Sequence, residues 1–229
     1  NRPGLAVCKF QIRTGPMMAG GALFDIAITG KGAHGARPES GIDPVMTAAY
    51  VTTALQSIVA RNVRPLATAV LSVTQIHGGD AYNVIPQQAF IRGTARAFSN
   101  ETMALIGRNM EKIASGVAAG FGATAEVDFR ATFPPLVNDA TEAAFIADVA
   151  AELVGADNVN RSGGLVMASE DFSFMLNERP GAYIQIGNGD GAGGCEVHNP
   201  GYDFNDQALP FGASLGALLV ERKLSRLEG

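Results

Sequence analysis

The fold of the first half of this chain is decided by the stretch LFDIAITG at residues 23–30. Apolar Phe24, Ile26 and Ile28 alternate with less hydrophobic neighbours, which is the two-residue period of a strand with one buried face. A strand of this kind has to be covered on its apolar side, so the surrounding sequence must supply a helical layer and further strands.

The segments after residue 30 provide both. Asp43-Pro44 predicts the start of a helix, with Asp43 as N-cap and Pro44 at the first helical position, and apolar residues continue at helical spacing to Asn62. Two strands are predicted over residues 67–76 and 88–98. A second helix is predicted after a cap at Asn100, and a last strand over residues 123–129. The second helix carries an apolar stripe formed by Met103, Ile106, Met110, Ile113 and Val117.

The resulting order is strand, helix, strand, strand, helix, strand. This βαββαβ order is typical of the ferredoxin-like split motif, in which one helical layer covers one face of a four-stranded sheet. The other face and the edges of such a sheet are free for partners.

A domain boundary is predicted at Phe133-Pro134-Pro135. Beyond it, Asp139 and Glu142 have the spacing of a capping box, and the helix that they begin ends at Gly155. A strand over 182–187 and a final helix over 206–227 follow. These elements are too few to close a sheet, so residues 1–20 and 134–229 are interpreted as parts of a larger α/β domain, with residues 21–133 as a separate one. The predicted class is α/β (α+β).

Composition favours a globular protein with small-molecule or protein partners. The net charge is −5, and the Lys and Arg residues are scattered, so the basic patch of a nucleic-acid binder is missing. No segment approaches the ~20 apolar residues that cross a bilayer. Cys8 and Cys195 form no disulfide framework and no export segment is recognised, so a cytoplasmic location is expected.

A glycine-rich loop at residues 30–35 fits the pattern GxGxxG and follows a strand. A dinucleotide site requires a helix that begins directly after such a loop, whereas the predicted helix begins only at Asp43. We therefore favour a simpler use of these glycines, in which the backbone turns sharply and presents His34 on a loop.

The segment CEVHNPGYDFND at residues 195–206 presents His198 beside a Pro-Gly turn. Cys195 and His198 have the spacing of half a zinc site, but no nearby residues supply two further ligands. We favour His198 as a metal ligand and Cys195 as a bystander. Glu170 and Asp171 are either an acid/base pair or capping residues at a helix start.

Seven segments taken together resemble the aminoacylase and carboxypeptidase family of metallopeptidases, in the branch of hippurate hydrolase and other N-acyl amino acid amidohydrolases. They occur in the family's order over nearly the whole chain, which makes the resemblance specific. The segments are GPMMA at 15–19, GKGAHGARP at 30–38, IDP at 42–44, NVIP at 83–86, GTAR at 93–96, SEDF at 169–172 and HNPGYDFND at 198–206.

The resemblance implies a two-domain enzyme that holds two divalent metal ions, Zn or Mn, and a ferredoxin-like lid that forms a homodimer. It implies that His198 is a metal ligand and that His34 reaches the partner subunit's site to polarise the scissile carbonyl. It places Asn83 and Arg96 near the carboxylate or carbonyl of a small N-acyl amino acid, and Glu170 in a motif beside the site.

The chain departs from the family in one large respect. The family's Cys and His ligands, its paired glutamates and a further His lie upstream of anything in this sequence, the last His directly before a segment like that at residues 1–4. The chain is therefore expected to be a fragment that is inactive alone. The alternatives are a non-catalytic dimerisation module, and a nucleotide-binding regulator that uses the glycine loop.

Overall fold

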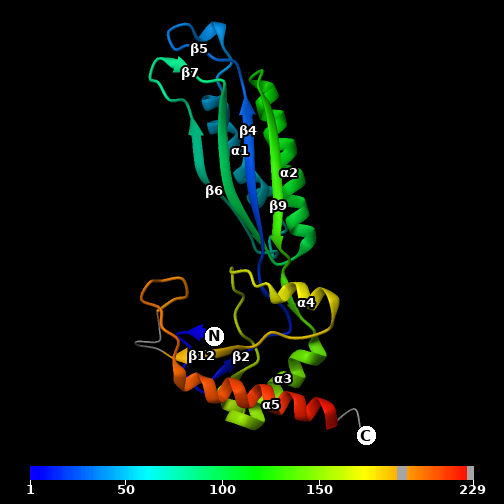
Figure 1. Cartoon of the computed structure of the whole chain (residues 1–229). Helices are drawn as coiled ribbons and strands as arrows, with labels where there is room; N and C mark the ends of the chain where they lie inside the picture. Colours follow the sequence, from blue (N-terminus) through cyan, green and yellow to red (C-terminus); the bar gives the residue numbers. More distant parts are fainter. Residues whose placement is uncertain (190–194, 226–229) are drawn as a thin grey trace. The chain divides into compact units, whose positions relative to one another are not determined.

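The computed structural model describes residues 1–189 and 195–225. The chain divides into two compact units (Figure 1). One, which we call the sheet unit, consists of Met18–Pro135 with Met167–Asp171. The other, the terminal unit, combines both ends of the chain: Asn1–Met17, Leu136–Val166 and Phe172–Gly229.

The sheet unit has the βαββαβ order that the sequence predicts, which confirms the mixed α and β class. Its sheet has the strand order β6-β8-β4-β9, and all three pairings are antiparallel. This is the strand order of the ferredoxin-like motif. The elements are β4 (Gly20–Thr29), α1 (Pro44–Ser57), β6 (Ala69–Gly78), β8 (Gln88–Ala97), α2 (Asn100–Gly120) and β9 (Thr124–Phe133).

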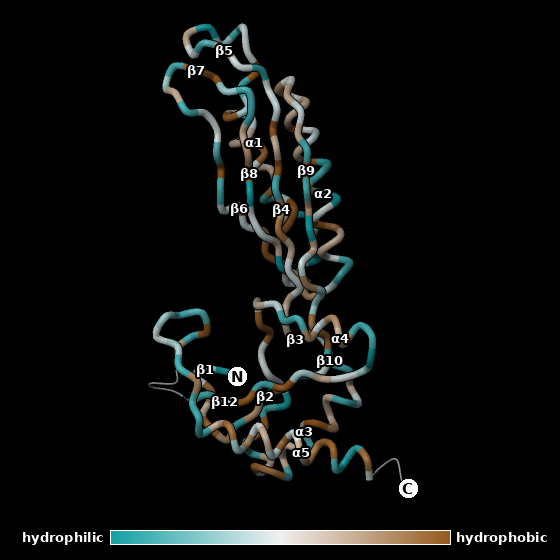
Figure 2. Tube along the Cα trace, in the orientation of Figure 1, coloured by the Kyte–Doolittle hydropathy of each residue, from teal (hydrophilic) through white to brown (hydrophobic). Residues whose placement is uncertain are grey.

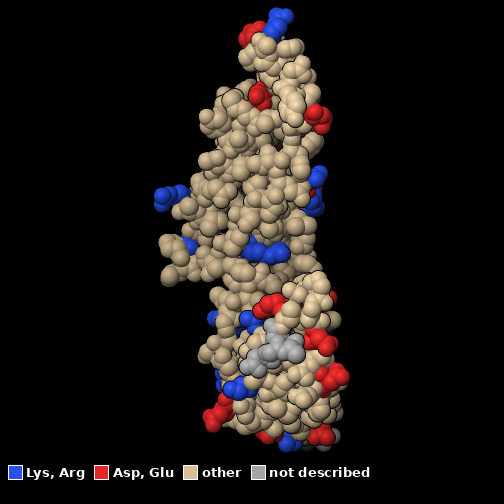
Figure 3. Space-filling model, turned by 90° about the vertical axis from the view of Figure 1, so that its left-hand side faces the viewer, with Lys and Arg blue, Asp and Glu red and all other residues tan. Residues whose placement is uncertain are grey.

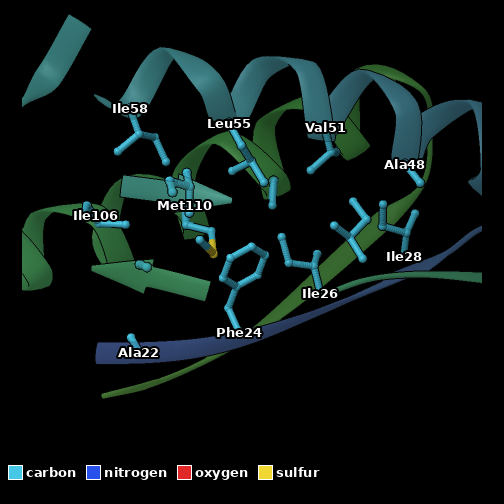
Figure 4. Close-up of a cluster of buried hydrophobic side chains, with 14 of the residues drawn as sticks. Ala22, Phe24, Ile26, Ile28, Ala48, Val51, Leu55, Ile58, Ile106 and Met110 are labelled. Carbon is cyan, nitrogen blue, oxygen red and sulfur yellow. The ribbon is translucent and has the colours of Figure 1, made fainter. Parts of the chain in front are cut away.

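The core of the sheet unit lies between the sheet and its two helices (Figure 4). Phe24 and Ile26 of β4 are buried and point toward Leu55 of α1 and Met110 of α2. The alternation in the deciding strand therefore has the cause that the sequence suggests, because every second side chain meets the helical layer.

Both helices begin at side-chain caps. The N–H groups of Val45 and Met46 donate to Asp43 Oδ1 at 2.8 and 3.1 Å, as the sequence predicts for α1. The cap of α2 is Ser99, whose Oγ accepts from the Thr102 N–H at 3.1 Å. The prediction of Asn100 was wrong by one residue, because Ser99 is the residue whose extended backbone lets its hydroxyl face the helix.

Some element boundaries also differ from the prediction. The helix predicted to run to Asn62 changes after Ser57 into a π-helical turn, η2 (Ile58–Asn62). β9 continues four residues beyond the predicted end, to Phe133. At one end of the sheet unit the chain forms a small antiparallel pair, β5 (Ala33–His34) with β7 (Val84–Ile85), followed by the short helix η1 (Pro38–Ser40).

The terminal unit contains a four-stranded sheet of short strands in the order β1-β12-β2-β11. Three of these strands are only two residues long, and sequence periodicity did not reveal them because two residues contain no repeat. The strands are β1 (Arg2–Pro3), β2 (Phe10–Gln11), β11 (Val159–Asn160) and β12 (Gln185–Gly189). A separate pair joins β3 (Gly15–Met18) to β10 (Leu136–Asn138).

Helices cover the core of this sheet, in which Phe10, Phe145 and Leu215 are buried. Asp139 caps α3 as predicted, but Glu142 does not complete a capping box, because its carboxylate binds Lys223 of α5 at 2.6 Å. The last predicted helix is η5 followed by α5, and residues 226–227 of that prediction lie outside the described residues. The helices are α3 (Ala140–Val154), η3 (Ala156–Asn158), α4 (Phe172–Glu178), η5 (Asp206–Ala208) and α5 (Leu209–Ser225).

Neither hydrophobic nor charged residues are massed in one part of the chain. Hydrophobic and hydrophilic residues follow one another along the strands and helices (Figure 2). On the face in Figure 3, Lys and Arg residues are scattered among Asp and Glu. Among the described residues, no helix is long and apolar enough to cross a membrane.

Candidate substrate and metal site

His34 is exposed on β5, where it pairs with Val84 of β7. Its Nδ1 accepts a hydrogen bond from the Ala36 N–H at 3.0 Å. An acceptor nitrogen carries no proton, so the proton of the neutral imidazole lies on Nε2. The side chain therefore offers an Nε2–H donor, which is the group needed to polarise a carbonyl oxygen.

Asn83 lies beside His34, so the structure brings these two predicted residues together. The Gly35 N–H donates to the backbone oxygen of Asn83 at 2.7 Å. A Cβ atom at position 35 would lie 3.1 Å from that oxygen, so a glycine permits the close approach of the two loops. The Asn83 side chain is exposed at the same end of the sheet unit.

Gln87 was not singled out by the sequence, yet it holds the glycine loop that leads to His34. Its side-chain Oε1 accepts from the Gly32 N–H at 3.0 Å, and its Nε2 donates to the Gly30 oxygen at 2.8 Å. The Gly30 N–H donates in turn to the Gln87 backbone oxygen at 3.0 Å. No pattern in the sequence connects positions 30 and 87, because tertiary pairing creates the contact.

Arg96 lies near the opposite end of β8, and the structure does not bring it close to His34 within one chain. From Gln88 to Arg96 the strand advances eight residues, or roughly 27 Å. Ala95 and Ala97 are buried toward the helices, so Arg96 points to the other face of the sheet.

Arg96 lies against Gly21, its partner across the β4–β8 pair. A Cβ atom at position 21 would be 2.2 Å from one guanidinium nitrogen of Arg96 and 2.9 Å from Ser169 Oγ. The guanidinium thus occupies space that exists because residue 21 has no side chain. Ser169 Oγ is buried without a hydrogen-bond partner among the described residues. Glu170 follows it and is half-buried, so its motif lies next to Arg96.

Arg96 differs from the other two arginines on the same sheet face, because Arg92 and Arg130 are paired with carboxylates. Arg92 Nε binds Asp25 Oδ1 at 2.6 Å, and Arg130 binds both Asp25 and Asp128. The hydrogen bond from Arg130 is the main cause that lowers the pKa of Asp25, and Arg92 adds to it, while partial desolvation opposes the shift. In the part of the chain that the structure describes, no hydrogen bond or ion pair to the Arg96 guanidinium occurs.

His198 lies in the terminal unit, on an exposed loop, in a left-handed backbone conformation with φ of 68°. The buried amide of Asn188 fixes the end of this loop: its Nδ2 donates to the Asp203 oxygen at 3.1 Å, and its Oδ1 accepts from the Asn205 N–H at 2.9 Å. The loop also meets the first residue of the chain, because Asn1 Nδ2 donates to the Tyr202 hydroxyl.

The residues that could hold a metal ion do not form a complete centre. Across residues 1–189 and 195–225, no group of three or more His, Cys, Asp or Glu side chains is arranged to hold one. One imidazole does not fit a divalent ion that needs four or more ligands, so His198 alone cannot form the site. The glycine loop is no better suited to a nucleotide, since it leads into β5 and η1 rather than directly into a helix.

The family model described as peptidase family M20/M25/M40 matches residues 4–222. The chain belongs to this family. The resemblance to a peptidase family in the seven sequence segments is thereby confirmed.

Curated relatives of this chain are hydrolases by name. The IAA-amino acid hydrolase ILR1-like 4 of Arabidopsis thaliana is 36% identical over 98% of this chain and 52% of its own length. Hippurate hydrolase of Campylobacter jejuni is 36% identical over 94% of the chain and 56% of its own length. The chain therefore spans about half the length of these relatives.

A solved structure of the M20 family has the same fold. The YXEP protein of Bacillus subtilis, described as a dinuclear metal-binding peptidase, is 30% identical and superposes with a TM-score of 0.78. The match covers 96% of this chain and 54% of the YXEP chain. Two metal ions are thus described for a relative whose fold this chain shares.

Proposed function

We propose that the full-length protein containing this chain hydrolyses the amide bond of N-acyl amino acids such as hippurate. The observation that carries this proposal is the guanidinium of Arg96, which is half-buried and unpaired within the described residues. Every N-acyl amino acid keeps a free carboxylate, and a guanidinium is the side chain best suited to bind it. The names of the relatives support the same substrate class.

Within this function, His34 polarises the scissile carbonyl through its Nε2–H, and Asn83 contacts the substrate beside it. The roughly 27 Å of strand between the His34 end of the sheet unit and Arg96 prevents both residues from acting on one substrate within a single chain. His34 therefore serves the site of a second subunit in a homodimer formed through the sheet unit, which acts as the lid. Glu170 completes the substrate contacts near Arg96.

The metal centre consists of two divalent ions, Zn or Mn, with His198 as one ligand. Metal ions in such hydrolases activate water and stabilise negative charge on oxygen. The described residues supply only a part of the ligand set, so the remaining ligands and the general base come from the rest of the full-length protein.

It follows that the 229-residue chain alone is inactive. Both described cysteines are free thiols, which supports a reducing cytoplasmic location. The competing function is a non-catalytic dimerisation module. It gains support from large hydrophobic residues that are exposed on the sheet, such as Leu23 and Phe90, and from the absence of a metal-ligand cluster among the described residues.

One experiment separates the two functions. Hippurate turnover and oligomeric state are measured for the full-length protein, for its His34→Ala and His198→Ala variants, and for the 229-residue chain. The enzyme function predicts that each substitution lowers turnover at least a hundredfold and leaves the dimer intact. Loss of the dimer, or no turnover by the full-length protein with Zn or Mn, would favour the module. Turnover by the isolated chain would refute its inactivity.

A further inference from the structure

The six-residue loop that carries His34 is held by two other segments. Lys31 forms an antiparallel bridge with Ile42 through two backbone hydrogen bonds of 2.9 Å, and the rest of the loop pairs with residues 83–87. Residues 30–35 run antiparallel to residues 83–87, and the contacts are regular: His34 pairs with Val84, and the Gly35 N–H donates to the Asn83 oxygen. Gln87 makes the remaining contacts, with three hydrogen bonds of 2.8 to 3.0 Å to Gly30 and Gly32.

The side-chain hydrogen bonds of Gln87 take the place of backbone hydrogen bonds that a regular strand pair would make at Gly30 and Gly32. The side-chain amide of Gln87 has one N–H donor group and one C=O acceptor, and it binds the Gly30 oxygen with the first and the Gly32 N–H with the second. Glycine has the most backbone freedom to lose, and the Lys31–Ile42 pair holds only the residue between Gly30 and Gly32, so the Gln87 amide adds a second restraint at the two glycines themselves.

The Gln87 side chain is exposed, and this determines what it can do. Water competes for exposed hydrogen bonds, so the contribution of Gln87 to global stability is small. Its effect on geometry is larger, because the last residue that it binds, Gly32, lies two residues before His34 in the same loop. A reacting group that is misplaced by about 1 Å can lose a hundredfold in rate.

We propose that Gln87 is a positioning residue for His34: its side-chain amide fixes the Gly30–Gly32 segment and thereby the direction of the His34 Nε2–H. The inference rests on the proposed function, because it gives Gln87 importance only through the role of His34. Gln87 itself touches neither substrate nor metal ion. Its influence on turnover passes entirely through the loop.

The test compares three variants of the full-length protein. Gln87→Ala removes both side-chain bonds and is expected to lower kcat for hippurate about tenfold to a hundredfold, with KM within about twofold of wild type. Gln87→Glu keeps the acceptor for the Gly32 N–H but loses the donor to Gly30, so an intermediate kcat is expected. Gln88→Ala is the matched control, because Gln88 is the adjacent exposed glutamine and its side chain, among the described residues, binds only the Thr29 hydroxyl, at 3.3 Å.

A double-mutant cycle separates positioning from a general structural role. In the His34→Ala background, Gln87→Ala is expected to cause no further loss of turnover, because both changes remove the same interaction. Additive losses in the double variant would overturn the inference, as would an unchanged kcat for Gln87→Ala.

A second readout does not depend on turnover. Among the described residues the Gly32 N–H donates only to the Gln87 side chain, so amide exchange at Gly32 is expected to accelerate at least tenfold in Gln87→Ala and to stay unchanged in Gln88→Ala. Unchanged exchange at Gly32 would refute the Gln87 hydrogen bond itself. If exchange accelerates but His34→Ala is fully active, the proposed function has failed and Gln87 has no positioning role.

Discussion

At the scale of single residues, the chemistry of this chain depends on which atoms are already bonded. His34 Nδ1 is an acceptor for the Ala36 N–H, so its other nitrogen is available as a donor. Arg96 and Arg92 lie four positions apart on one strand face, but Asp25 neutralises only Arg92. His34 Nε2 and the Arg96 guanidinium, two groups that we assign to the substrate, therefore have no hydrogen-bond partner among the described residues.

The donor role of His34 predicts a graded response to substitution. His34→Ala should lower kcat for hippurate by about a hundredfold to a thousandfold, the usual cost of removing a donor to a developing oxyanion. His34→Gln should retain part of the activity, because its side-chain amide still offers an N–H group. Steady-state kinetics of the two full-length variants is the measurement. Equal activities would show that the donor is not what matters at this position.

The Arg96 guanidinium occupies the space beside Gly21, so we expect a single methyl group at position 21 to disturb substrate binding. Gly21→Ala places a Cβ atom within 2.2 Å of the Arg96 guanidinium and displaces it, so KM for hippurate should rise about tenfold, in keeping with the loss of a hydrogen bond to a charged group. Gly116→Ala is the control. It lies in α2 with no atom within 4 Å of the new Cβ, and should stabilise the helix by about 0.5–1 kcal/mol. A KM for Gly21→Ala equal to that of the control would contradict the prediction.

At the scale of elements, β4 joins the two halves of the sheet unit. Its inward residues meet the helices, and its outward Asp25 links β8 and β9 through Arg92 and Arg130. β4 also carries Gly21. The pairing of β4 with β9 shifts register at this residue, next to the Arg96 guanidinium. Irregularities of this kind are frequent beside functional sites, because they change the direction of the chain locally.

The ion pairs of Asp25 with Arg92 and Arg130 predict that the free energy of unfolding depends on pH in the acidic range. Arg130 and Arg92 lower the pKa of Asp25 in the folded protein below its ordinary value of 3.8, so the stabilisation is present above that pH. It is lost as the pH falls through the lowered pKa, where the carboxylate takes up a proton.

The comparison of wild type with Asp25→Asn checks this behaviour. The difference between their unfolding free energies, measured by urea unfolding, should be constant from pH 7 to pH 5 and should shrink as the pH falls below about 3.8. High salt should reduce the difference, because these groups are partly exposed and screened. A difference that grows on acidification would contradict the assignment.

At the scale of the whole molecule, the candidate residues are distributed over two units. Arg96, Asn83 and His34 belong to the sheet unit, and His198 belongs to the terminal unit. The proposed hydrolase function requires ligands beyond those of the described residues, since these contain no group of three or more metal-binding side chains. This chain spans about half the length of its curated relatives, which agrees with that requirement.

Metal dependence is the prediction at this scale. Removal of metal from the full-length protein by a chelator should abolish hippurate turnover, and addition of Zn or Mn should restore it, with two ions bound per subunit by elemental analysis. His198→Ala should lower the bound metal to one ion or fewer. Full metal content in that variant would show that His198 is not a ligand.

The sequence by itself determined those features that repeat or that occupy contiguous positions. The two-residue period of residues 23–30 and the apolar stripe of α2 predicted the βαββαβ unit, because burial of one face imposes a period on each element. Seven short motifs were sufficient to identify the family and to name His34, Asn83, Arg96, Glu170 and His198 as candidates.

Only the tertiary structure decided the contacts between distant segments. Gln87 binds a segment more than fifty residues earlier in the chain, Ser169 lies beside Gly21, and two-residue strands pair across the terminal unit. None of these leaves a local pattern, because a hydrogen bond or a close approach constrains each partner only through the position of the other. Periodicity records which face of an element is buried, whereas the fold decides which residues on two elements meet.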